Sequence, residues 1–238
     1  MIDRILLSFA IIALSGCTGM VSTAPRPDAY FDVQAAVTDS ESLFSGDEAV
    51  LSDADIQRIL QFDYAPPALS RVALMPFGRE AWSMWSEEVA IATERMQTQA
   101  IKTLASSPAV YDASYLPSIL IPEHKSVPHL REAAARYQAD LLLVYRSYCR
   151  SFERYRIFAA DQSRAYCGVE AILLDTRTGL VPFTTAILKS FDLKEQHGDM
   201  NFRETIVKAQ LGAVDEALRD VSNEILTFLA EHHPEERT

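Results

Sequence analysis

The sequence is poor in glycine and has no glycine-rich loop. Its eight glycines are scattered over 238 residues, so the pattern that cradles phosphate groups in nucleotide-binding proteins is missing. A Gly-x-Ser-x-Gly motif is also missing, and with it the main sequence signal of a serine hydrolase. The five histidines do not have the spacing of strong metal ligands, and Glu87–Glu88 and Asp192–Glu195 are interpreted as solvated surface. We therefore expect a protein that is not an enzyme, with no catalytic residues, no metal site and no cofactor.

Positive charge is scarce as well. The chain has 22 Lys and Arg against 33 Asp and Glu, a formal net charge of −11, which argues against a general nucleic-acid binder. Between Arg26 and Arg58 there is no basic residue, and eight acidic residues fall in this segment: Asp28, Asp32, Asp39, Glu41, Asp47, Glu48, Asp53 and Asp55. Such a segment repels itself and stays extended, so we expect residues 17–50 to form an acidic tether. A calcium site is the alternative, but the Asp-x-Asp-x-Asp-Gly spacing is missing.

Long hydrophobic runs are absent beyond residue 14, because ionisable residues interrupt every later stretch. The one early run, Ile5–Leu14, is too short to span a bilayer as a helix. It follows Arg4 and precedes Leu14-Ser15-Gly16-Cys17, an arrangement typical of a secretory signal. These four residues resemble the lipobox of bacterial lipoproteins. The resemblance implies that residues 1–16 are a signal peptide, that cleavage precedes Cys17, and that Cys17 carries the lipid; an ordinary signal peptide that is cut elsewhere is the alternative.

The expected anchor also predicts a location. Two or three acyl chains on one residue hold a protein at a membrane almost permanently, whereas a single chain holds it marginally. Thr18, rather than Asp, follows the cysteine. By the lipoprotein sorting rule this implies the outer membrane, with the rest of the chain facing the periplasm.

The hydrophobic pattern predicts one α/β domain over residues 71–231, a fold in which helices pack on a single sheet of about five strands. A capping box at Ser52 begins a short helix through Leu60, within a helix-and-linker segment 51–70. Residues 232–238 are expected to be a C-terminal tail. The predicted strands are 71–77, 110–120, 139–156, 165–175 and 180–191, and the predicted helices are 85–104, one that begins after Ser126, and 202–231. The order is β-α-β-α-β-β-β-α.

Cysteine is also rare, with three residues in the chain. If Cys17 carries lipid, Cys149 and Cys167 remain as a pair in an oxidising compartment. In a hairpin that places them opposite each other, the midpoint falls at residue 158, inside the expected turn 156–163. The sequence therefore predicts a disulfide; two reduced, buried cysteines are the alternative.

One predicted strand carries an unusual alternation of arginine and aromatic residues. In strand conformation its alternate residues share one face: Arg146, Tyr148, Arg150, Phe152, Arg154 and Arg156. Guanidinium and aromatic groups can stack and hold anions. We expect an interaction patch for lipid phosphates, an acidic partner or a neighbouring subunit's tether. A solvated face whose arginines cover aromatic surface is the alternative.

Three segments together resemble a known family: Arg71–Phe77, Leu130–Val144 and the Asp175–Gly179 turn. They are similar to the periplasmic lipoprotein domain of the curli secretion channel (CsgG-like) and to the related TolB N-terminal-like fold, over roughly residues 70–230. The resemblance implies a non-enzymatic envelope protein, and several family members form rings in export or assembly machines. We therefore expect a lipid-anchored periplasmic protein that binds envelope proteins or assembles with itself. A ligand-binding accessory subunit for polymer or lipid export, or an envelope hydrolase, is the alternative.

Overall fold

The computed structural model describes residues 42–43, 51–78, 86–155 and 159–232. Its five strands form one mixed sheet in the order β2-β1-β3-β4-β5. The elements along the chain are α2 (Asp53–Leu60), β1 (Ser70–Pro76), α3 (Glu87–Leu104), β2 (Val110–Tyr115), a 3-10 turn (Ser118–Leu120), α4 (Val127–Arg136), β3 (Leu141–Arg154), β4 (Gln162–Asp175), β5 (Phe183–Lys194) and α5 (Phe202–Glu231). The prediction of an α/β fold with a single five-stranded sheet is confirmed.

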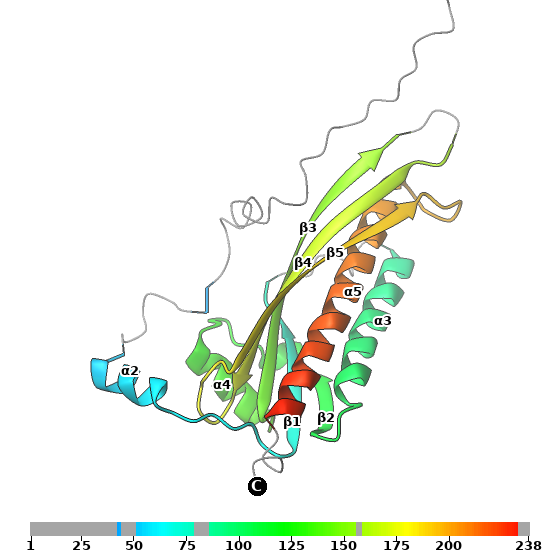
Figure 1. Cartoon of the computed structure of the whole chain (residues 1–238). Helices are drawn as coiled ribbons and strands as arrows, with labels where there is room; N and C mark the ends of the chain where they lie inside the picture. Colours follow the sequence, from blue (N-terminus) through cyan, green and yellow to red (C-terminus); the bar gives the residue numbers. More distant parts are fainter. Residues whose placement is uncertain (1–41, 44–50, 79–85, 156–158, 233–238) are drawn as a thin grey trace, which may run out of the picture.

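The pairing of the strands divides the sheet into two parts. β1 is parallel to both β2 and β3, and the intervening helices α3 and α4 provide the crossovers that parallel pairing requires. β3, β4 and β5 form an antiparallel meander. β3 and β4 have 14 residues each, so this meander extends well past the short strand β2 (Figure 1).

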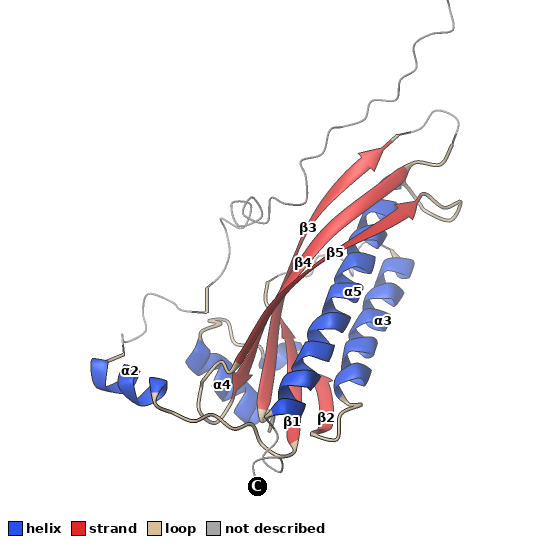
Figure 2. Ribbon diagram, viewed as in Figure 1, coloured by secondary structure: helices blue, strands red, loops and turns tan. Residues whose placement is uncertain are grey.

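The helices cover the two faces of the sheet unequally, as Figure 2 shows. α3 and α5 lie on one face and bury the larger apolar cluster, which includes Leu74, Leu143, Leu173 and Val221. α4 lies on the other face and buries a smaller cluster around Met75. Among the described helices none covers the part of that second face formed by the far halves of β3, β4 and β5. Its side chains are half-buried along most of β3 and exposed along β5.

α5 is long because its sequence supplies a continuous apolar face over 30 residues. Buried residues recur at alternating spacings of three and four, among them Leu211, Val214 and Leu218. Asn201 caps the helix, since its side chain accepts a hydrogen bond from the backbone N–H of Glu204. None of the described helices is both long enough and apolar enough to cross a membrane.

The turn between β4 and β5 is held by Asp175, whose side chain is fully buried. Its carboxylate accepts hydrogen bonds from the backbone N–H and the hydroxyl of Thr178, and from Arg177. Tyr64, in the segment before β1, donates a fourth hydrogen bond to it over 3.2 Å. Gly179 completes the turn at φ +77°, a conformation that costs other residues free energy. The turn therefore anchors the segment that leads into β1.

Several element ends differ from the prediction. The strand expected over 110–120 ends at Tyr115, because Pro117 has no N–H to pair and a 3-10 turn follows it. The strand expected over 180–191 lies at Phe183–Lys194, after a turn closed by the hydrogen bond from the Asp175 N–H to the Leu180 carbonyl. The expected helix over 85–104 begins at Glu87 with Ser86 as its cap.

Candidate interaction surface

The arginine and aromatic side chains of β3 lie on the exposed side of the sheet. The alternate residues of the same strand face α5: Cys149 packs in the larger core, and Ser151 accepts a hydrogen bond of 2.8 Å from the amide of Gln210 in α5. Because neighbouring residues of a strand point to opposite faces, Arg146 through Arg154 occupy the other face. We call this exposed part of β3, β4 and β5 the open face. Arg156 and Cys17 lie outside the described residues.

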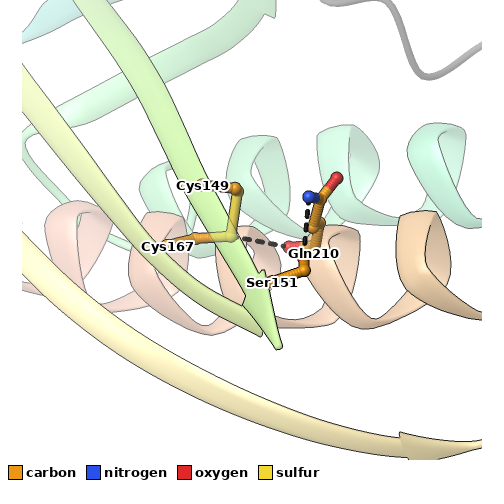
Figure 3. The surroundings of a disulfide bond; sticks show 4 residues. All are labelled: Cys149, Ser151, Cys167 and Gln210. Atoms are coloured by element: carbon orange, nitrogen blue, oxygen red, sulfur yellow. Dashed lines mark hydrogen bonds between the residues drawn. A yellow bond between two sulfur atoms is a disulfide. The ribbon is translucent and has the colours of Figure 1, made fainter. Parts of the chain in front are cut away.

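A disulfide joins the neighbouring strands β3 and β4 beneath this surface. Cys149 and Cys167 are directly paired in the antiparallel register and form the bond. Figure 3 shows the pair beside α5, where the Cys167 sulfur lies 3.4 Å from the carbonyl oxygen of Gln210. The bond lies on the side that faces α5, and it fixes the register of β3 on β4 beneath the open face.

Arg146, nearest α4, forms an ion pair with Glu170. Its guanidinium lies 2.5 Å from the Glu170 carboxylate, and each side chain is 31% exposed. The two residues are cross-strand partners, where opposite charges stabilise a sheet. The Glu170 carboxylate therefore balances the charge of Arg146, which gives this arginine a structural partner on the neighbouring strand.

The middle of the open face is aromatic. Tyr148 lies against Gly168, and a Cβ at that glycine would come within 2.2 Å of the tyrosine ring. Beyond it, Phe152 and Tyr166 meet edge to face with ring centroids 5.5 Å apart. Arg150 is directly opposite Tyr166 in the register. The absence of a Cβ at Gly168 therefore lets the Tyr148 ring pack onto the strand backbone. The rings of Tyr148, Phe152 and Tyr166 together make this part of the face aromatic.

The end of the hairpin carries a groove of about 490 Å³, which β3, β4 and β5 line together. Its charged lining residues are Arg154, Arg164 and Lys194 with the carboxylates Glu153 and Asp192. Arg164 hydrogen-bonds both carboxylate oxygens of Asp192 across the strands, one of them over 2.8 Å, and this raises the pKa of Arg164. Arg154 and Lys194 flank the groove at the two ends of one cross-strand row. Neither of them has an ion pair within the described part of the chain. This end of the sheet therefore carries both signs of charge, with Arg164 neutralised by Asp192.

A second charged cluster, on the side of α3 and α5, escaped the sequence analysis. The Lys208 ammonium lies 2.7 Å from the Asp199 carboxylate and 3.2 Å from that of Glu204, and it also pairs with Glu88. Asp199 and Glu204 are 1% and 4% exposed. Glu88 was expected on the solvated surface, and it is partly exposed but paired. The only sequence signal was the spacing of four between Glu204 and Lys208 on one helix.

Hydrogen bonds decide the charge state of this cluster. Burial by itself would raise the pKa of Asp199, but the Gln196 N–H and the Lys208 ammonium bind its carboxylate and hold that pKa below its usual value. The Ser86 hydroxyl, ahead of the Met200 N–H, lowers the pKa of Glu204. Burial would lower the pKa of Lys208, yet its carboxylate partners raise it. Glu88, Asp199 and Glu204 each offer an oxygen within 4.8 Å of the others, a spacing that would suit a divalent cation, but the ammonium already contacts all three.

Comparison of the sequence with protein-family models and with curated proteins finds no match. Among solved structures, a hypothetical protein from Chlamydia trachomatis has a TM-score of 0.41 and 10% identity, with 68% of this chain and 98% of that chain covered. The PelC dodecamer from Paraburkholderia phytofirmans has 0.34 and 14%, over 67% and 94%. A minor lipoprotein from Acinetobacter baumannii has 0.35 and 11%, over 66% and 92%. Likenesses at these scores carry no inference about function.

Proposed function

We propose that this chain is a non-catalytic, lipid-anchored protein of the bacterial envelope, whose α/β domain binds protein partners or further copies of itself through the open face. The observation that carries the proposal is the composition of that face. Arginine and tyrosine dominate the energetic centres of protein interfaces, and here both are aligned on a sheet surface that no described helix covers. The lipobox at Cys17 supports the anchor, and Thr18 supports the outer membrane.

The charges of the face favour an acidic partner. Arg154, Lys194 and the Arg150 side chain belong to one end of the surface, while the chain as a whole carries −11. A cationic patch on an anionic protein steers an acidic surface toward one orientation, because the remainder of the molecule repels it. The lipid would add to this effect, since it confines the domain to a membrane surface and raises its local concentration near partners held there.

Two measurements test the proposal, one of the lipid anchor and one of the open face. Mass spectrometry of the mature protein should find a chain that begins at Cys17 with added acyl mass. In intact cells, a photo-crosslinking amino acid in place of Leu188 should capture a partner protein or a second copy. Leu188 lies beside Gly168 on the open face and is 41% exposed.

The matched control is the same photo-crosslinking residue in place of Ile91. This side chain is 48% exposed and belongs to α3, on the opposite face. Equal capture from both positions would contradict the assignment of the interface to the open face. An unmodified mature start would contradict the anchor.

A further inference from the structure

The strand β5 forms an edge of the sheet over its whole length. It has 12 residues, Phe183–Lys194. It pairs with β4 on one side, and among the described strands none pairs with its other side. The opposite edge, β2, has only 6 residues. A long edge leaves a row of backbone N–H and C=O groups available to another strand.

The register of β5 on β4 shows which backbone groups point outward. The N–H of Glu195 donates a hydrogen bond of 2.8 Å to the carbonyl of Asp161, and this pair continues the antiparallel pairing of Lys194 with Gln162. Alternate residues of an antiparallel strand bond to the same neighbour, so the odd-numbered residues of β5 bond to β4. The even-numbered residues direct their N–H and C=O groups away from the sheet: Thr184, Ala186, Leu188, Ser190, Asp192 and Lys194.

β5 lacks the main features that protect an edge strand from pairing. Its register on β4 is regular from Phe183 to Lys194, so no bulge bends it away, and no proline or glycine interrupts its sequence. Lys189, the charged residue near its middle, lies on the side of α5 and pairs with Asp220. The central part of the edge can therefore accept a strand without leaving this ammonium unpaired.

The flank of α5 beside this edge is acidic. Asp220 pairs with Lys189 of β5. Glu224 accepts a hydrogen bond from the Thr185 hydroxyl of β5, so both carboxylates lie on the side of α5 that faces this strand. Glu216 lies one turn away in the same row and, after Asp220, contributes to the raised pKa of Lys189. Three carboxylates and one ammonium therefore border the position of an added strand.

These charges decide between two kinds of added strand. α5 packs over both β4 and β5, so a second copy joined edge to edge would place its own α5 about 10 Å from the first, at two strand spacings. Helices pack at that distance, and the two acidic flanks would face each other across the junction. Like charges that meet at an interface oppose association, whereas basic side chains on an added strand neutralise Glu216 and Glu224.

We propose that the outer edge of β5 accepts an extended segment of another protein as a sixth, antiparallel strand, with lysine or arginine side chains toward α5 and apolar side chains toward the open face. The cations lie beside Glu216 and Glu224. The apolar side chains extend the surface at Leu188, which is 41% exposed. Backbone hydrogen bonds supply the affinity in this mode of binding, and alternate side chains supply the specificity. The inference goes beyond the proposed function, because it concerns the edge of the sheet and not the open face.

A fluorescent peptide in which lysine and valine alternate tests the pairing, with the purified full chain in non-ionic detergent and fluorescence anisotropy as the measurement. Opposite residues of an antiparallel pair face the same side, so the backbone N–H groups of the valines donate to β5 and those of the lysines point away. Methylation of the valine backbone nitrogens should weaken binding about tenfold or more, whereas methylation of the lysine backbone nitrogens should change it less than about threefold. Equal affinity for the two methylated peptides, which carry the same charge, would overturn the inference.

Ser190 offers a matched pair of protein variants. S190P removes one outward N–H, and an edge strand tolerates proline where the missing N–H faces solvent. S190P should weaken binding of the lysine–valine peptide about tenfold, whereas S190T keeps the N–H and should stay within about twofold of the wild type. Equal binding by the two variants would overturn the pairing. If S190P unfolds, the two methylated peptides still decide the question on the wild type.

The acidic flank is tested separately. E216Q with E224Q should weaken binding of the peptide about fivefold, because two charge pairs at the surface are lost. E87Q with E94Q, which changes exposed residues of α3, should stay within about twofold of the wild type. A peptide in which glutamate and valine alternate should bind at least about tenfold more weakly, and comparable binding of the two peptides would contradict the preference for a basic segment.

Light scattering of the purified chain identifies the other possible occupant of the edge. A monomer that binds the lysine–valine peptide supports the inference. A dimer that S190P converts into a monomer would overturn it and assign the edge to a second copy. Capture at Leu188 in intact cells and the lipid on Cys17 are measured independently, so either proposal can fail without the other.

Discussion

Replacement of Lys208 by methionine should destabilise the protein strongly. Lys208 is 17% exposed and neutralises carboxylates that are themselves buried, on Asp199 and Glu204. Methionine keeps most of the side-chain volume and removes only the ammonium. The variant therefore retains two anions within a few ångströms of each other, with hydrogen bonds from Ser86 and Thr205 but no positive charge.

The magnitude follows from the cost of breaking a buried ion pair. Removal of one partner from such a pair costs about 3 to 5 kcal/mol, since the other charge stays buried and uncompensated. Glu88 is 59% exposed and can rotate into water, so it adds little. We expect the lower end of the range, about 3 kcal/mol, because Lys208 itself keeps some contact with solvent.

The pH dependence distinguishes this cause from simple loss of packing. In the wild type the pKa values of Asp199 and Glu204 are lowered, so their stabilisation is present above the unfolded pKa values, about 4, and is lost as the pH falls through the folded ones. In K208M, burial and mutual repulsion should instead raise these pKa values. The folded variant then takes up protons between neutral pH and about pH 5 and gains stability there, by about 1.4 kcal/mol per pH unit for each proton.

Urea unfolding followed by far-ultraviolet circular dichroism measures both effects. The difference in unfolding free energy between the wild type and K208M should be about 3 kcal/mol near neutral pH and smaller by about 1 kcal/mol near pH 5. K102M, on the exposed surface of α3, should stay within about 0.5 kcal/mol of the wild type. A K208M penalty that is below about 1 kcal/mol, or equal at both pH values, would refute the electrostatic account.

Three further predictions concern the hairpins. Serine at both Cys149 and Cys167 should lower the free energy of unfolding by about 3 kcal/mol under non-reducing conditions, because the bond closes a separation of 18 residues. Addition of a reductant should lower the melting temperature of the wild type and leave that of the variant unchanged. Y64F should cost about 1 kcal/mol in urea unfolding, since its hydroxyl no longer donates to the buried Asp175 carboxylate; an unchanged midpoint would exclude this anchor. G179A should cost about 1 kcal/mol, because alanine is strained at φ +77°; a melting temperature equal to that of the wild type would contradict a strained turn.

The spacing of apolar residues along the sequence predicted the helices and strands that depend on residues close together in the chain. The apolar spacing of α5 and the apolar run of β1 are properties of single segments, so the sequence indicates them directly. The pairing of Cys149 with Cys167 follows from the position of one turn, since the register of an antiparallel hairpin is fixed by its centre. The expected turn region, 156–163, overlaps the junction between β3, which ends at Arg154, and β4, which begins at Gln162.

Contacts between distant segments could not be read in the same way. Glu88 and Lys208 are 120 residues apart and meet only because α3 and α5 pack side by side. Arg146 meets Glu170 only because the register of β3 on β4 places them opposite each other. The sequence alone does not show that register. Leu43 packs against the smaller core, and its carbonyl accepts a hydrogen bond from the Val127 N–H of α4; nothing in the sequence of residues 17–50 indicates this contact.

The open face explains why the hairpin needs a covalent bond. An antiparallel sheet can leave one face to solvent, but the far halves of β3 and β4 then gain apolar burial from α5 alone. The disulfide, the Phe152–Tyr166 ring contact and the Arg164–Asp192 pair hold the strands where a second layer of helix would otherwise do so. A helix over this face would bury more apolar surface, but it would also cover Arg150 and Arg154. The links between strands therefore stabilise the hairpin while the described helices leave uncovered the face that we propose as the binding surface.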